Sequence, residues 1–286
     1  FETGNVLIGS VSRLYMSNKC LLIADHKSVD KQIHIFNKND FSYLTSIGNF
    51  GEGPEEITVM GCLAIDEAHH QLYVSDHAKQ KIFSYDMDSV MVDSLYKPQV
   101  KTAMNETLFP SEYQYINDTL SIAVLIKPTS TSTFNQFLGR WNMNTGEMIP
   151  MKYTHPDIQK KRITFAASEK AGIYVECYTR HDLMTICSLD GELLYNIYGP
   201  DWDGGNGNKL QSFGTVMIGN DKIFVSYCGE DYARDSFPTK ILVFDLEGNY
   251  LKTLETGYKI SDCCYDSFNN RIILSLNDVV QFAYLD

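Results

Sequence analysis

Residues 62–86 read CLAIDEAHHQLYVSDHAKQKIFSYD, and this stretch decides the fold. It contains three short runs of alternating apolar residues, at 62–65, 72–76 and 81–85, which are separated by two polar connections. Alternation with a period of two is typical of half-buried strands, and short polar connections between such runs favour antiparallel pairing. The stretch therefore predicts three adjacent antiparallel strands.

The middle run of this stretch recurs at a regular interval along the whole chain. Six runs share its pattern: LLIAD at 21–25, LYVSD at 72–76, LSIAV at 120–124, IYVEC at 173–177, IFVSY at 223–227 and IILSL at 272–276. Their central residues are 23, 74, 122, 175, 225 and 274, so the intervals are 51, 48, 53, 50 and 49 residues. Within most periods a further alternating run precedes this one and two others follow it. Four antiparallel strands in about 50 residues make one blade of a β-propeller.

The two ends of the chain complete the set of blades. The sixth period ends after its third strand, near residue 284, while residues 5–10 (NVLIGS) precede the first full period. We predict that residues 5–10 add the fourth strand of the last blade and close the ring, which leaves no sheet edge exposed. The predicted fold is all-β: a single six-bladed β-propeller domain over residues 1–286, with four antiparallel strands per blade. Almost no helix is expected, at most one or two turns within residues 99–107.

The charge and hydropathy of the chain argue against two classes of partner. Lys and Arg number 24 against 36 Asp and Glu, which gives a net charge of −12. Such a field repels phosphate backbones, so we expect no nucleic acid partner. No apolar run reaches the roughly 18 residues that span a bilayer. Because the chain begins with Phe1, we expect that a leader has been removed, and membrane contact only through a lipid anchor lost with it.

Cysteine usage indicates thiols rather than a disulfide framework. The seven cysteines sit mostly in apolar, strand-like runs; they are Cys20, Cys62, Cys177, Cys187, Cys228, Cys263 and Cys264. A chain of this length does not need covalent staples, so buried free thiols are expected. The chain has no CxxC or CxxH spacing, which argues against a structural zinc site.

A resemblance to a known family appears in one connection between blades. Residues 47–56, IGNFGEGPEE, resemble the Gly-rich linker of NHL-type propeller repeats, with Glu55 in place of the usual last Gly. In its six-period architecture the whole chain is similar to the NHL-like and TolB-like propellers found among secreted or lipid-anchored proteins of Bacteroidetes-type bacteria. This resemblance implies an extracytoplasmic protein, in the periplasm or at the cell surface as a lipoprotein.

Candidate ligand residues cluster where propellers usually bind. Loops from second to third strands open on one face around the central channel, and the first strands line that channel. The candidates on this face are Arg13, Asp25, His26, Asp76, His77, Arg162, Arg180, His181, Trp202, Glu230 and Asp231. His26 and His77 are one period apart and each follows an Asp. Together with His181 they could hold a divalent cation in the central channel or act as a general acid–base pair.

Each of these candidates also has a purely structural interpretation. An Asp at the end of a second strand often caps the following turn by accepting backbone N–H groups, and the His after it is often solvated. Arg13 and Arg162 belong to a mixed ring of charges, with Glu56, Glu112 and Lys259, that favours salt bridges. Trp202, in the Gly-rich loop 199–208, either stacks on a sugar or other planar ligand or packs over the rim. His69 and His70 lie in a first-to-second-strand turn and are expected at the surface, His34 is expected to be partly packed, and His155 carries no signal.

Two functions follow from these features. GxSxG, the P-loop, GxGxxG and HExxH are all missing from the sequence, so the first hypothesis is a non-catalytic extracytoplasmic binding or interaction module. Its ligand or partner would be a small molecule, a glycan or a protein. The alternative is a metal-dependent hydrolase or lyase similar to the six-bladed gluconolactonases, although their Glu and Asn/Asp ligands have no matching positions here. An RNA-binding role is disfavoured because such surfaces are basic.

Overall fold

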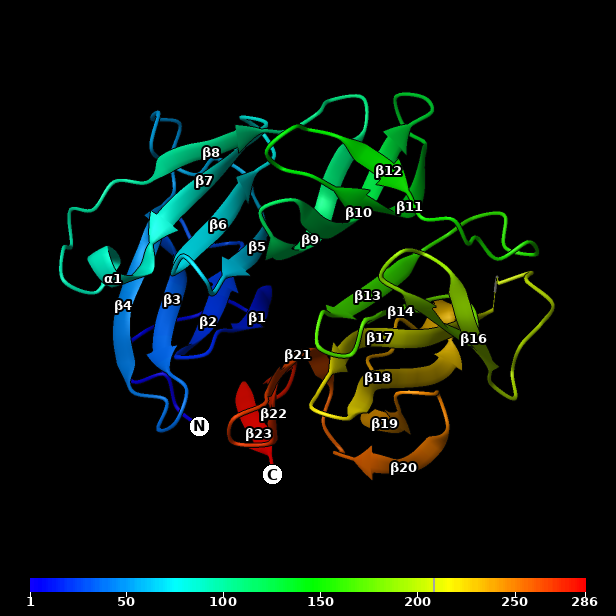
Figure 1. Cartoon of the computed structure of the whole chain (residues 1–286). Coiled ribbons are helices and arrows are strands. Elements are labelled where there is room, and N and C mark those ends of the chain that lie inside the picture. The colour runs from blue at the N-terminus through cyan, green and yellow to red at the C-terminus, as the bar shows by residue number, and fades with distance from the viewer. Residues whose placement is uncertain (208) are drawn as a thin grey trace. The chain divides into compact units, whose positions relative to one another are not determined.

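The computed structural model describes residues 1–207 and 209–286, which are built almost entirely of antiparallel β-sheet (Figure 1). The chain divides into two compact units, residues 1–150 and residues 151–286. Each unit holds three sheets, and within every sheet neighbouring strands are consecutive in the chain. The prediction of six blades and an all-β propeller fold is confirmed.

The first unit contains blades 1 to 3. Blade 1 consists of β1 (Ser12–Met16), β2 (Cys20–Asp25), β3 (Lys31–Asn37) and β4 (Tyr43–Asn49). Blade 2 consists of β5 (Met60–Asp66), β6 (Gln71–Asp76), β7 (Lys81–Asp86) and β8 (Gln99–Ala103). Blade 3 consists of β9 (Phe109–Asn117), β10 (Leu120–Pro128), β11 (Phe134–Trp141) and the short β12 (Met148–Pro150).

The second unit contains blades 4 to 6. Blade 4 consists of β13 (Ile163–Ser168), β14 (Ile173–Tyr178), β15 (Leu183–Ser188) and β16 (Leu193–Tyr198). Blade 5 consists of β17 (Leu210–Ile218), β18 (Lys222–Asp231), β19 (Lys240–Asp245) and β20 (Tyr250–Glu255), with a single 3-10 turn, η1 (Tyr232–Arg234), after β18. Blade 6 consists of β21 (Ile260–Asp266), β22 (Arg271–Leu276) and β23 (Phe282–Leu285).

The N-terminal segment does not form the strand that we predicted. In the described part of the chain, blade 6 has three strands and residues 5–10 belong to no sheet. The backbone N–H of Gly9 instead donates a hydrogen bond of 2.8 Å to Oδ2 of Asp25, at the end of β2. The prediction that residues 5–10 complete the last blade is therefore wrong, because this donor is taken by a side chain of blade 1.

Helix occurs at a different place from the one considered in the sequence. Residues 99–103, where a helical turn or two was allowed, form β8 and pair with β7. The chain's one α-helix in the described residues is α1 (Met87–Val90), on the connection between β7 and β8 (Figure 1). Its N-cap is Asp86, whose carboxylate accepts the backbone N–H of Ser89 at 2.7 Å. No helix in the described residues is long and apolar enough to cross a membrane.

The core lies between neighbouring sheets within each unit. The second strand of each blade is the most deeply buried; β2, β14 and β22 are buried at every residue. Aromatic side chains join adjacent blades: the ring of Tyr73 in β6 meets that of Tyr115 in β9 edge-on, with centroids 5.3 Å apart. Each such pair stabilises the fold by about 0.5–1.5 kcal/mol, in addition to the stabilisation from burying its apolar surface. This packing explains the many aromatic residues in the composition.

All seven cysteines are buried and none forms a disulfide in the described structure. Burial raises the pKa of the Cys62 thiol to about 12 and that of Cys187 to about 11. The expectation of buried free thiols agrees with this arrangement.

Candidate functional site

Two of the predicted ligand carboxylates, Asp25 and Asp76, hold the backbone in place. Asp76 is fully buried, and its two oxygens accept hydrogen bonds from four backbone N–H groups at 2.8–3.2 Å, those of Thr58, Val59, Ala78 and Lys79. Asp25 is 4% exposed and accepts from the N–H groups of Gly9 and Lys27. Both carboxylates therefore cap turns by accepting backbone N–H groups, which is the structural interpretation that we considered for them from the sequence.

The histidines that follow them, His26 and His77, converge on Gly61. Nε2 of His26 lies 3.2 Å from the carbonyl oxygen of Gly61, and a Cβ at Gly61 would fall 2.1 Å from Nε2 of His77. Gly61 sits where the pairing of β5 with β6 shifts register, as glycine often does where a backbone bulges or is closely approached. Only glycine leaves room for His77 here.

Each of these two rings keeps one buried nitrogen without a protein partner in the described structure. The atoms are Nδ1 of His26 and Nε2 of His77. Burial lowers the pKa of His77, and His26 lowers it further, while Glu112 and Asp76 raise it. The ring of His77 also packs edge-on against Phe109, with centroids 4.7 Å apart. Both rings thus lie near Gly61, although they come from adjacent blades.

Arg13 is engaged with a carboxylate on another blade of the same unit. Its guanidinium donates to both oxygens of Glu112 in β9, and both side chains are about two-fifths exposed. It also lies over the ring of Tyr15, with Cζ 5.4 Å from the ring centroid. This geometry matches the salt-bridge interpretation of the predicted ring of charges.

In the second unit, the predicted residue Trp202 packs against other rings. Its ring centroid lies 5.0 Å from that of Tyr198, 5.3 Å from that of His155 and 6.0 Å from that of His181. Its loop is pressed against the 155–158 segment, since a Cβ at Gly205 would fall 2.3 Å from the carbonyl oxygen of Asp157. Asn208, the last residue of the predicted loop, lies outside the described residues.

His155 and His181 are both buried beside Trp202. His155 is 2% exposed and its Nε2 lies 2.9 Å from the hydroxyl of Tyr198; His181 is 6% exposed, and its Nδ1 has no protein partner in the described structure. Burial lowers the pKa of both rings. His155 had no recognisable role in the sequence, because it lies in a connector that reaches these rings only when the chain folds.

Three of the remaining candidates of the second unit each contact a residue of η1. Arg180 lies over the ring of Tyr232, with Cζ 3.9 Å from the centroid. Glu230 pairs with Arg234 at 3.2 Å, and Asp231 caps η1 by accepting the N–H of Ala233. Burial lowers the pKa of Arg162, and the nearby charge of Arg180 lowers it further.

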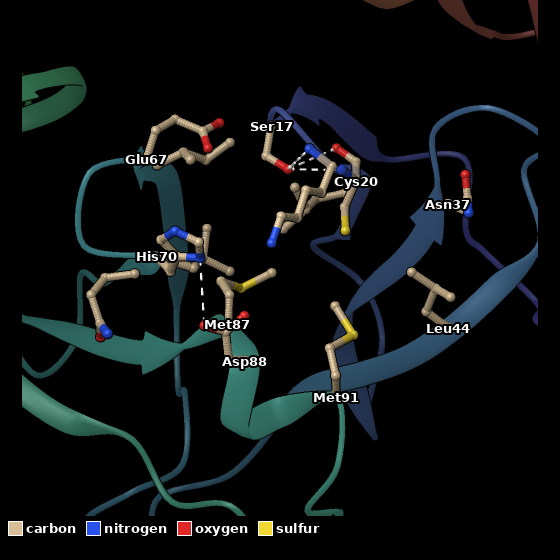
Figure 2. Close-up of a pocket in the computed structure, with 14 residues that line it drawn as sticks. Ser17, Cys20, Asn37, Leu44, Glu67, His70, Met87, Asp88 and Met91 are labelled. Carbon is tan, nitrogen blue, oxygen red and sulfur yellow. Dashed lines mark hydrogen bonds and ion pairs between the residues drawn. The ribbon is translucent and has the colours of Figure 1, made fainter.

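A pocket that the sequence did not predict lies between blades 1 and 2 of the first unit (Figure 2). Its volume is about 460 Å³. Apolar side chains form much of its wall: Cys20, Leu22, Leu44, Ile65, Leu72, Met87 and Met91. Polar side chains complete it: Ser17, Lys19, Asn37, Glu67, His70, Gln71 and Asp88.

Local hydrogen bonds fix the walls of this pocket. Oγ of Ser17 accepts the backbone N–H of Cys20 at 2.8 Å and so shapes the turn between β1 and β2. Glu67 accepts the N–H of Asn18 at 2.7 Å, which ties the corresponding turns of the two blades together. Figure 2 shows His70 and Asp88 facing each other on one side; Nδ1 and Oδ2 are 3.5 Å apart.

The arrangement suits the capture of a ligand with an apolar body. Ligand sites are commonly concave, mainly apolar and about 300–1,000 Å³ in volume, with a few polar groups that set orientation. The pocket has these properties, and Met87 begins the short helix α1 while Met91 is its C-cap. Unbranched methionine side chains adapt readily to the shape of a ligand.

Fold and pocket together define a six-bladed β-propeller with a pocket between two of its blades. Residues 2–138 match the model of a protein family described as a 6-bladed beta-propeller, DUF5128. No curated protein matches the chain.

Several solved structures share the fold. A member of the duf4221 family from Bacteroides vulgatus is 10% identical, with 96% of this chain and 92% of that chain covered and a TM-score of 0.60. A putative exported protein from Bacteroides fragilis is 14% identical, with 96% and 81% covered and a TM-score of 0.60. The β-propeller domain of Cps50 (Swd1) from Myceliophteria thermophila is 9% identical, with 99% and 98% covered and a TM-score of 0.60. At these identities the likeness shows the fold alone.

Proposed function

We propose that this protein is an extracytoplasmic binding protein whose ligand places an apolar group in the pocket between blades 1 and 2. The observation that carries the proposal is the pocket of about 460 Å³ with its apolar wall and polar rim. Burying apolar ligand surface contributes about 25 cal/mol per Å², so a group that buries 100 Å² gains roughly 2.5 kcal/mol. An apolar wall of this kind favours a small molecule or a protein side chain over a glycan.

The proposed location is supported by two likenesses. The six-period architecture resembles that of secreted or lipid-anchored NHL-like and TolB-like propellers, and the Bacteroides fragilis neighbour is described as a putative exported protein. Fractionation of the source cell, with detection of the native protein by antibody, tests this location. Recovery in the cytoplasmic fraction alone would contradict it.

We also propose that residues 1–286 form one domain. Three solved propellers each match 96–99% of the chain, which supports a single domain built of six repeats. One domain should unfold in a single cooperative transition on heating. Two separate transitions in a calorimetric scan would count against it.

Filling the pocket should abolish binding of an apolar probe. Anilinonaphthalene sulfonate combines an apolar ring system with one anionic group, which suits the wall and Lys19 on the rim. Met91 is 37% exposed at the edge of the pocket, so Met91→Trp should fill the space without disturbing the core. We expect probe affinity, measured by fluorescence titration, to fall at least about tenfold, which equals about 1.4 kcal/mol.

Val92→Trp is the matched control for this experiment. Val92 is the next residue, is 87% exposed and does not line the pocket. The Val92→Trp protein should bind the probe as the unsubstituted protein does. Both variants should have the melting temperature of the unsubstituted protein. Equal probe binding by both variants would show that the pocket is not the site.

We also propose that the ligand could instead contact the channel-face residues that were predicted from the sequence. Nδ1 of His26 and Nε2 of His77 are buried without a protein partner in the described structure, and a buried polar atom of this kind calls for a partner such as a water molecule or a ligand group. His77→Gln in the same titration distinguishes the two surfaces. A loss of probe binding in His77→Gln but not in Met91→Trp would move the proposed site to the channel face.

A further inference from the structure

A His and two Asp side chains come together where blades 2 and 3 turn between their first and second strands. Asp66 ends β5, His69 lies in the turn that follows, and Asp118 lies in the turn between β9 and β10. Oδ2 of Asp66 is 2.8 Å from Nδ1 of His69. One potential ligand atom from each of the three residues lies within 4.8 Å of the other two.

We propose that Asp66, His69 and Asp118 bind a divalent first-row transition metal ion of the zinc type. Imidazole nitrogen and carboxylate oxygen are both ordinary zinc ligands, at about 2.0–2.2 Å from the ion. In the tetrahedral geometry that zinc favours, two ligand atoms are about 3.4 Å apart. Asp118 is exposed, and its side chain has to move inward by at most roughly 1.4 Å to reach that separation. No predicted channel histidine belongs to this group.

Two tyrosines hold the carboxylates of this cluster. The hydroxyl of Tyr73 donates to Oδ2 of Asp66 at 2.8 Å, and that of Tyr115 donates to Oδ1 of Asp118 at 2.5 Å. The two rings are themselves in edge-on contact. Metal ligands in proteins are commonly oriented by such outer hydrogen bonds. The carboxylates are thus oriented by groups outside the three proposed ligands.

The equivalent turn of blade 6 shows that folding does not require a histidine at this position. There, Asp266 and Asn269 stand four periods, or 200 residues, beyond Asp66 and His69. Nδ2 of Asn269 donates to Oδ2 of Asp266 at 2.6 Å, the contact that His69 makes in blade 2. The next residues, His70 and Asn270, have nearly the same positive φ, 54° and 51°. An amide can therefore do the structural work of His69, and the imidazole adds a metal-binding nitrogen.

The cluster is open on one side. A pocket of about 390 Å³ is lined by His69 and Asp118 together with Tyr73 and Asn144, so water or a further ligand can complete the coordination. Lys101 also lines it and lies with Nζ 5.4 Å from the centroid of the Tyr73 ring. Its positive charge opposes a cation, so Lys101→Gln should tighten metal binding.

The test is calorimetric titration of the untagged full-length protein with zinc chloride at neutral pH. We expect one equivalent to bind with micromolar affinity, because three protein ligands are present. His69→Asn, which copies the residue of blade 6, and Asp118→Asn should each weaken binding at least about tenfold. His70→Asn is the matched control, because His70 is the adjacent histidine and lies against Asp88 instead; it should bind as before.

Melting temperatures measured without metal show that each variant is folded. The proposal is overturned if zinc does not bind up to about millimolar concentration, an affinity worth only about 4 kcal/mol. It is also overturned if His69→Asn binds zinc as tightly as the unsubstituted protein. A parallel titration with calcium chloride checks the class of ion: calcium binding tighter than zinc binding would exclude a zinc-type site.

Discussion

Replacing Asp76 by alanine is expected to lower the free energy of unfolding by about 4 kcal/mol. The carboxylate is fully buried and accepts four backbone N–H groups from two different segments, at 58–59 and 78–79. Alanine would leave these donors without an acceptor, and each buried donor without a partner costs about 1–3 kcal/mol. Some of them will reach water, so the full sum is not expected.

Urea unfolding followed by far-ultraviolet circular dichroism measures this loss. The control is Asp245→Ala in blade 5, where the carboxylate also accepts backbone N–H groups, those of Glu247 and Asn249, but at an exposed turn. Its loss of stability should be much smaller, because water replaces an exposed acceptor. If Asp76→Ala were no more destabilising than Asp245→Ala, the capping role would be refuted, and Asp76 would return as a candidate ligand residue.

Acidification from pH 7 to pH 5 should destabilise the protein through its buried histidines. Burial lowers the pKa of His34, His77, His155 and His181 below the ordinary 6.5. The unfolded chain then binds more protons than the folded one, so the stability that these neutral rings contribute is complete above pH 6.5. It is lost as the pH falls through 6.5 toward the folded-state pKa values, by up to about 1.4 kcal/mol per pH unit for each fully buried ring.

Thermal unfolding at a series of pH values between 7 and 5 provides the measurement. The double variant His155→Gln, His181→Gln removes two of the four titrating rings, both under the Trp202 loop. Nearby acids, Asp157 and Asp203, favour protonation of these rings, but burial has the larger effect. The variant's melting temperature should depend less steeply on pH, whatever its value at pH 7. An unchanged slope would mean that other groups control the acid response.

The sequence predicted the blades well because the repeat is local. Each hairpin is specified by alternating residues and a polar turn, so the second strands appear close to where LLIAD and its five counterparts occur. The contact of His26 with the neighbourhood of His77 also followed from spacing, since equivalent residues of adjacent blades must be neighbours. The fate of residues 5–10 did not follow, because it depends on one side-chain acceptor, Asp25, that alternation cannot reveal.

The pocket and the proposed metal site at Asp66, His69 and Asp118 were not predicted, for a related reason. The pocket is the space left between side chains of residues as far apart as Ser17 and Met91, and a repeat pattern carries no information on gaps in packing. His69 was correctly expected in a surface turn, since its side chain is 57% exposed. Comparing equivalent turns of adjacent blades, as for His26 and His77, would have placed Asp118 beside it.

The buried thiols have a consequence for how the protein tolerates its chemical surroundings. Thiolates, not thiols, attack disulfides and react with oxidants, and burial in apolar strands both raises the thiol pKa and blocks access. The seven cysteines are therefore unreactive while the blades stay folded. The fold depends on no covalent crosslink, so a reducing agent or a mild oxidant should leave its covalent structure unchanged. Folding of this chain therefore requires no step in which cysteines are oxidised.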